Sequence, residues 1–234
     1  MPTSKEHFAQ RSAALRQELV VQGKRVQAQV EASFSSLFSR QAESAKQAIS
    51  LDDPIDAADV AIEQAAVALL IDATRQGAEL AERDLRDVLT IVKANNELER
   101  IADVGVDVAE LVPKLEKMGP AFPDTFRVLT NSVVGIVRDT HQSLEKSDPQ
   151  LANIVLQSQH AVWAFKGALV KETELKVAKG QLSIEFAFML LEVAQQCEVI
   201  ADHCTNIAEQ VIYLTTGKIV RHMDTCWVEV PRQG

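Results

Sequence analysis

The sequence repeats itself once, at a separation of 99 residues. Residues 97–112 and 196–211 agree at seven of 16 aligned positions, and several of the remaining positions carry similar residues. Self-similarity at one long period is the mark of a duplicated structural unit. The repeat therefore predicts two copies of one unit placed in tandem, with each copy ending in the repeated segment.

Helical spacing of apolar residues predicts that both copies are built from helices. Only 9 Gly and 7 Pro interrupt 234 residues, and aromatic residues make up 5% of the chain, which favours long helices over strands. The pattern predicts six helices and no sheet, at about 5–49, 55–76, 82–112, 123–147, 149–179 and 182–215. The expected fold class is all-α, with two tandem three-helix bundles related by a pseudo-twofold axis and helices crossing at roughly 20°.

The breaks between these helices suggest the domain limits. We expect a first unit at 1–118, a second at 119–217 and a tail at 218–234, in which CWVEV (226–230) is the one stretch that suits an extended chain. The first helix is either continuous or kinked near Gly23. Gly217 suits the position just beyond the end of the last helix.

Charge and cysteine content narrow the function classes. The net charge of −9 argues against non-specific binding to nucleic acid and suits cation binding. The three cysteines, Cys197, Cys204 and Cys226, suggest no disulfide framework and indicate a cytoplasmic protein; the first two have the spacing of core residues. We see no signal peptide and no apolar run near the ~20 residues needed to span a bilayer, so a membrane role would require a partner.

The repeat carries carboxylates one helical turn apart. The two rows comprise Glu99, Asp103 and Asp107 in the first copy, and Glu198, Asp202 and Asn206 in the second. Like charges at this spacing cost roughly 0.2–0.5 kcal/mol per pair, and a bound cation would remove that cost. Oxygen ligands of this kind suit Mg²⁺, Mn²⁺, Ca²⁺, ferric iron and also zinc. The alternative is a plain solvated face, which is the commoner meaning of such a pair.

Other residues give little support to catalysis. No histidine has Glu three residues before it, which disfavours a ferritin-like oxidase, and the chain has no nucleotide-binding or hydrolase motif. We therefore expect a protein that is not an enzyme. His203 is interpreted as a surface or packing residue, and Trp163 and Phe165 as core residues.

The longest motif resembles a known family. CEVIADHCTNIAEQVIYLTTGK (197–218) is similar to the second signature of the PhoU family, and residues 83–110 resemble its counterpart in the first half. The resemblance covers nearly the whole chain. It implies a negative regulator of phosphate uptake and of the phosphate-starvation response, which contacts a phosphate ABC transporter and a sensor histidine kinase. A homodimer would fit exposed helix faces.

The family also implies metal clusters of iron, zinc or other ions, such as manganese or magnesium, on the repeated motifs. Carried over by motif, the metal candidates are Glu99, Asp103, Glu198 and Asp202, with Asp107, Asn206, Asp56 and Glu63 as weaker candidates. This chain departs from the family in the fifth helix, where Gln159 and Trp163 stand at positions that are usually acidic. Val199 replaces a usual Arg, and Val104 and Gly105 replace a usual His-Ala pair. These departures fall mostly on the second half.

Two alternatives share the same fold. One is an accessory protein that gates a low-affinity phosphate or cation permease directly. The other is a helical scaffold that binds no metal.

Overall fold

We analysed a computed structural model, which describes residues 4–116, 118 and 121–220. Its helices are α1 (Ser4–Ser39), α2 (Ala42–Ser50), α3 (Asp53–Arg75), α4 (Glu82–Glu110), α5 (Val112–Leu115), α6 (Asp124–Lys146), α7 (Pro149–Ala178) and α8 (Ile184–Thr216). Six of them are long, and no strand occurs in this described part of the chain. The all-α class and the six long helices are therefore confirmed.

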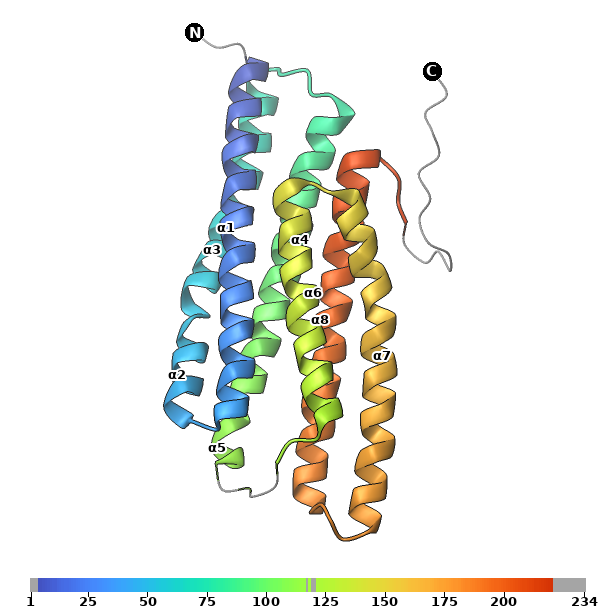
Figure 1. The fold of residues 1–234 in the computed structure, drawn as a ribbon. Helices are drawn as coiled ribbons and strands as arrows, with labels where there is room; N and C mark the ends of the chain where they lie inside the picture. Colours follow the sequence, from blue (N-terminus) through green and yellow to red (C-terminus); the bar gives the residue numbers. More distant parts are fainter. Residues whose placement is uncertain (1–3, 117, 119–120, 221–234) are drawn as a thin grey trace.

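The six long helices run side by side, three from each half (Figure 1). Helices α1, α3 and α4 pack together, as do α6, α7 and α8. The two halves meet where α4 packs along α8 and where α1 packs against α6. Helices α4 and α8 run in opposite directions, while α3 and α7 lie at opposite edges of the molecule (Figure 1).

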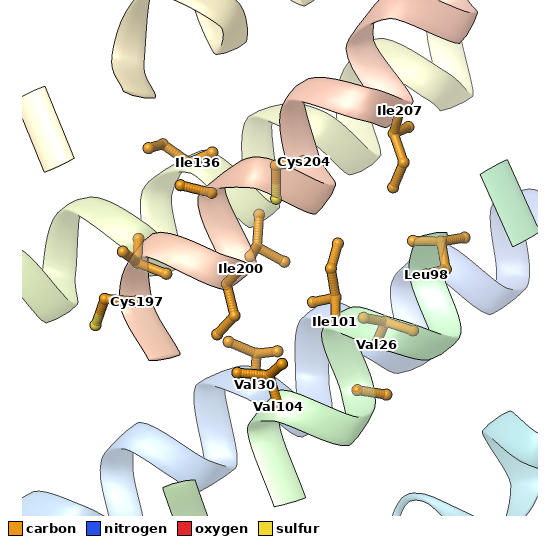
Figure 2. Packing of buried hydrophobic residues seen from close by; sticks show 14 of the residues in the cluster. Val26, Val30, Leu98, Ile101, Val104, Ile136, Cys197, Ile200, Cys204 and Ile207 are labelled. Atoms are coloured by element: carbon orange, nitrogen blue, oxygen red, sulfur yellow. The ribbon is translucent and has the colours of Figure 1, made fainter. Parts of the chain in front are cut away.

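The repeated helices α4 and α8 form the centre of the core. Ile101 of α4 and Ile200 and Ile207 of α8 are buried, and Figure 2 shows side chains of these two helices converging with Val26 and Val30 of α1. Burying an aliphatic side chain of this size stabilises the fold by about 1.5–3 kcal/mol. The apolar half of the repeated motif is therefore the contact between the two copies.

The two described cysteines belong to this core. Cys197 and Cys204 are fully buried free thiols on the inner face of α8, as their spacing predicted. Cys226 and the CWVEV stretch lie outside the described residues.

Of the two alternatives for the first helix, the one without a kink at Gly23 is confirmed, but the expected single helix over 5–49 is wrong because the chain breaks at Arg40 into α1 and α2. Helix α1 runs without a break through Gly23 and ends at Ser39, where Arg40 takes a left-handed conformation with φ of 54°. A Cβ atom at Gly23 would lie 2.9 Å from the Cδ2 atom of His141. The glycine thus permits the close approach of α6 and does not interrupt the helix.

Local signals set the other helix ends. Asp148 Oδ1 accepts hydrogen bonds from the amides of Gln150 at 2.9 Å and Leu151 at 3.2 Å, which caps α7, and Pro149 occupies its first turn. Gly217 ends α8 with φ of 73°, as predicted.

One predicted core residue is exposed. Trp163 retains 44% of its surface, because α7 lies at the edge of the bundle and buries only one face. Its ring contacts His160 edge-on at 5.2 Å. Phe165 packs against the core, as predicted.

Candidate metal centre

The first acidic row lies on one face of α4. Glu99, Asp103 and Asp107 follow at intervals of four residues, which places them one above another. Leu98 and Ile101, on a neighbouring face, are buried. Glu99 is half-buried, whereas the two aspartates are exposed. The row therefore follows the rim of the core, where its oxygens are accessible to solvent.

Helix α3 and the residue before it provide a second set of acids beside this row. They are Asp52, Asp56, Asp59 and Glu63. Burial raises the pKa of Glu99, and the negative charges of Asp103 and Asp59 raise it further. Burial likewise raises the pKa of Asp59, with Glu63 and Asp56 adding to the effect. Acids on either side of the contact between α3 and α4 therefore raise one another's pKa. We call the six residues the acidic groove: Asp52, Asp56, Asp59, Glu63, Glu99 and Asp103.

Among the acids of the acidic groove, Asp52 is the one whose charged form is most disfavoured. Burial, together with the charges of Asp56, Asp103 and Asp53, raises its pKa to about 6. Its Oδ1 atom is buried and has no hydrogen-bond partner. An ionised carboxylate at this position therefore lacks the compensation that buried charges need.

Little positive charge offsets the acidic groove. Within the described ranges, no Lys or Arg forms an ion pair with any of its six acids. Arg100 lowers the pKa of Glu99 slightly, as a minor effect. Asp59 and Glu63 line a cavity of about 350 Å³, to which Lys93 also contributes. The groove therefore offers oxygen ligands and excess negative charge, and the cavity lies at the end of the groove formed by Asp59 and Glu63.

The second row, Glu198 and Asp202 on α8, has different surroundings. Lys166 of α7 forms an ion pair with Glu198 Oε2, and its Nζ atom also donates to Gln195 Oε1 at 2.6 Å. Gln159 Nε2, also of α7, donates to Asp202 Oδ1 at 2.5 Å. Both carboxylates of the second row are therefore already bound by donors from the protein itself.

Two further predicted candidates lie between α4 and α8. Asn206 Nδ2 donates to Glu97 Oε2 at 3.0 Å, and Gln196 Nε2 donates to Asp107 Oδ2 at 3.2 Å. Glu97 and Gln196 are 99 residues apart, as are Asp107 and Asn206, so the two hydrogen bonds are equivalent under the pseudo-twofold relation. Each pairs one carboxylate with one amide.

His203 joins this interface through Glu97. Its Nδ1 atom lies 2.7 Å from Glu97 Oε2. Burial alone would raise the pKa of Glu97, but the hydrogen bonds from His203 and Asn206 outweigh it and hold the pKa below its ordinary value. The interpretation of His203 as a packing residue agrees with this contact.

Sequence reasoning missed several residues of these sites. They are Asp52, Asp59, Glu97 and Lys166. A signal existed for the first two, because Asp52, Asp56, Asp59 and Glu63 follow the 4-3-4 spacing of one helix face. The role of Lys166 had no local signal, since it depends on how α7 is rotated against α8.

The two rows differ in how well they suit a metal ion. No group of three or more His, Cys, Asp or Glu in the described part of the chain has its side chains gathered as a ready-made metal site. The acidic groove has the ligand type of a hard cation, and Asp52 contributes an unpartnered buried oxygen. In the second row, by contrast, the Lys166 ammonium group already pairs with Glu198, and Gln159 already donates to Asp202. Bilayer insertion is not indicated either: no described helix combines the necessary length and apolarity.

The sequence matches one family in two copies. A family model described as "PhoU domain" matches residues 20–112 and 126–211. A phosphate-specific transport system accessory protein PhoU homolog of Zymomonas mobilis is 32% identical over 187 residues, covering 80% of this chain and 77% of that protein. A homolog of the same description from Xylella fastidiosa is 29% identical over 203 residues, covering 86% and 82%.

Solved structures agree with this match. The crystal structure of PhoU from Pseudomonas aeruginosa superposes with a TM-score of 0.83 at 26% identity, covering 90% of this chain and all of that one. The phosphate transport system regulatory protein PhoU from Streptococcus pneumoniae gives a TM-score of 0.81 at 25% identity, covering 91% and 99%.

Proposed function

Because this chain belongs to the PhoU family, we propose that it is an accessory protein of phosphate transport that restrains uptake and the phosphate-starvation response when phosphate is plentiful. It acts in the cytoplasm through contacts with a phosphate ABC transporter and a sensor histidine kinase, and not by turning over a substrate. Homodimers form through its exposed helix faces. The observation that carries the proposal is the match of both halves to one domain, whose relatives are named as phosphate-specific transport accessory proteins.

Metal binding in the acidic groove is part of this proposal. Glu99 and Asp103 provide the central oxygens. Asp59 acts electrostatically on Glu99, and Asp52 and Asp107 each feel the charge of Asp103, while Asp56 and Glu63 are the weaker candidates beside Asp52 and Asp59. The support is the uncompensated charge of the groove and the unpartnered oxygen of Asp52. Iron, zinc, manganese and magnesium all accept oxygen ligands of this type. When bound, the ion supplies positive charge that neutralises the groove and fixes α3 against α4.

Deleting the gene in its own host tests the regulatory proposal. We expect a phosphate-starvation reporter to become active at high phosphate, and we expect complementation with the full chain to silence it. Altered phosphate uptake with normal reporter expression would instead indicate direct control of a low-affinity permease. A deletion that changes neither readout contradicts both functions.

Metal content tests the groove directly. Protein purified without chelator should contain iron, zinc, manganese or magnesium, and the variant Glu99→Gln/Asp103→Asn should lose it. Glu43→Gln is the control, because Glu43 is an exposed residue of α2 that forms an ion pair with Lys46 and is not one of the six groove acids. Native protein free of metal, or an unchanged content in the double variant, would leave the helical scaffold as the better description.

A further inference from the structure

We infer that Lys166 is the built-in cation of the second acidic row, so that Glu198 and Asp202 bind the protein's own ammonium group where the first half is open to a metal ion. The inference deepens the proposed function and rests on it in one respect, the binding of metal in the acidic groove of the first half. It makes the two halves chemically unequal although they share one fold. This chain would then carry one metal-competent groove and one groove closed by its own sequence.

Donors on α7 bind both carboxylates of the second row on α8. The Lys166 ammonium contacts Glu198 and donates to Gln195 Oε1, while Gln159 donates to Asp202 at 2.5 Å. The side chains of Lys166 and Glu198 retain only 24% and 26% of their surface. A half-buried pair of this kind is less screened by solvent than an exposed pair.

The pseudo-twofold relation shows which residues are equivalent in the two halves. Glu99 corresponds to Glu198, and Asp103 corresponds to Asp202, at the shared separation of 99 residues. In the first half, Asp59 lies near Glu99. In the second half, Lys166 takes the equivalent place beside Glu198.

The partners of Asp103 and Asp202 differ in the same way as those of Glu99 and Glu198. Asp52 lies near Asp103, and Gln159 bonds to Asp202. Asp52, the residue before α3, is seven residues from Asp59, and Gln159 is likewise seven residues from Lys166 in α7. Two of the four acids beside the first row, Asp52 and Asp59, thus correspond to donors beside the second. The replacement at two matched positions argues against a chance surface contact.

The ion pair of Lys166 with Glu198 should disfavour binding of a divalent cation to the second row. A divalent cation at Glu198 would have to displace or approach a lysine ammonium, which repels it and already satisfies the carboxylate. In the acidic groove no described Lys or Arg forms such a pair. A cation therefore meets an ammonium group in the second half, whereas the donor that reaches Asp59 in the first half is the neutral amide of Asn95, at 2.6 Å.

Equilibrium dialysis of the full chain against Mn²⁺, with elemental analysis, tests the inference. The variant Glu198→Gln/Asp202→Asn should retain the Mn²⁺ content of the native chain. The variant Lys166→Asp/Gln159→Asp should gain bound Mn²⁺, and adding Glu198→Gln/Asp202→Asn to it should abolish that gain. A loss of Mn²⁺ in the first variant, or no gain in the folded second variant, would overturn the inference.

A milder variant covers the case in which Lys166→Asp/Gln159→Asp does not fold. Lys166→Met keeps most of the unbranched apolar stem of the side chain and removes its charge. We expect its Tm to fall below that of the native chain without metal and to recover on adding Mn²⁺ by more than the native Tm rises. An equal response of the two proteins to Mn²⁺ would refute the role of Lys166.

The same series separates this inference from the proposed function. Loss of metal in Glu99→Gln/Asp103→Asn concerns only the acidic groove, and a native chain that binds no Mn²⁺ would remove the proposed metal centre there. Whether or not the native chain binds Mn²⁺, the extra Mn²⁺ bound by Lys166→Asp/Gln159→Asp is measured relative to the native chain. Failure of one proposal is therefore visible without failure of the other.

Discussion

At the scale of single residues, identical side chains at equivalent positions behave differently because of what faces them. Glu99 and Glu198 occupy the same place in the repeat. Burial and neighbouring acids raise the pKa of Glu99, whereas Glu198 is paired with Lys166. The chemistry of a carboxylate row is thus set by the helix packed beside it, and duplication of the row alone does not duplicate a site.

Asp52 provides a prediction at this scale. Its pKa in the folded protein is about 6, above the ~3.9 of an unfolded chain, so folding is favoured by protonation of this group. Its contribution therefore weakens stability progressively as pH rises from about 4 to 6 and then stays constant. We expect Asp52→Asn to stabilise the metal-free protein by about 1 kcal/mol at pH 7.5, after discounting for solvent screening.

Thermal denaturation at several pH values in the presence of chelator checks this expectation. The difference in Tm between Asp52→Asn and the native chain should be largest above pH 7 and vanish near pH 4. Gln47→Ala, at an exposed position of α2 whose side chain does not titrate, is the control and should change Tm equally at every pH. A difference that is independent of pH would mean that the titration of Asp52 is not the cause.

The sequence predicted the residue types of the site better than their partners. Spacing alone identified Glu99, Asp103, Glu198 and Asp202 as two matched rows, since a helix fixes which residues share a face. It could not identify Lys166 as the partner of Glu198, because that contact depends on the rotation of one helix against another. Residue spacing within a helix is local information, whereas the choice of partner is not.

At the scale of helices, polar and glycine contacts set the register within an apolar interface. Between α4 and α8, the hydrogen bonds from Asn206 to Glu97 and from Gln196 to Asp107 add directional contacts to the apolar packing and favour one alignment. The glycines play a related role. Both Gly23 and Gly105 lie where a side chain from another helix comes close. The sequence pattern predicted the helices from their periodicity, but it interpreted Gly23 as a possible kink because the neighbouring α6 cannot be seen locally.

Gly105 gives the first prediction at this scale. A Cβ atom there would lie 2.4 Å from Gln29 Oε1, and Gln29 is fully buried and donates to the carbonyl of Ala102 at 3.0 Å. Gly105→Ala should therefore displace this amide and destabilise the protein by about 1–3 kcal/mol. Gly135, inside α6 with nothing within 4 Å of such an atom, is the matched control. There the change to Ala should stabilise by up to about 1 kcal/mol, through helix propensity.

Chemical denaturation of both variants measures the comparison. Opposite signs of the change in unfolding free energy are expected for Gly105→Ala and Gly135→Ala. Equal changes would show that the close contact with Gln29 relaxes without cost.

Asn206 gives the second prediction for the helix interface. Asn206→Asp places a carboxylate against Glu97 at a half-buried position, where the donor is lost and like charges repel. We expect a loss of about 1–3 kcal/mol in unfolding free energy. The second change Glu97→Gln should restore most of that loss by exchanging the roles of amide and carboxylate.

A double-mutant cycle in denaturant gives the coupling between the two positions. Additive effects would contradict a direct interaction. Gln196→Glu opposite Asp107 is the equivalent test on the other side of the pseudo-twofold axis, and it should show the same sign.

At the scale of the whole molecule, the two halves share one core. Buried residues of both halves form a single continuous apolar cluster, in which α4 packs along α8 (Figure 2). Each half alone would expose the stripe that the other covers. The repeat in the sequence predicted two units correctly as a duplication, but it carried no information on how much of each unit's stability comes from the other.

The size of the shared interface leads to the last prediction. Residues 1–118 alone would expose Leu98, Ile101 and other buried side chains of α4, each worth about 1.5–3 kcal/mol, against a typical total stability of 5–15 kcal/mol. We expect this fragment to lack a cooperative thermal transition in far-UV circular dichroism and to bind a hydrophobic dye. The full chain should unfold in one transition, because the halves cannot lose their core separately. Mixing the fragment with residues 119–234 should restore the transition if the two halves recognise each other through α4 and α8. A monomeric 1–118 fragment that melts as sharply as the full chain would show instead that each bundle is stable by itself, and that the contact between α4 and α8 joins two finished domains.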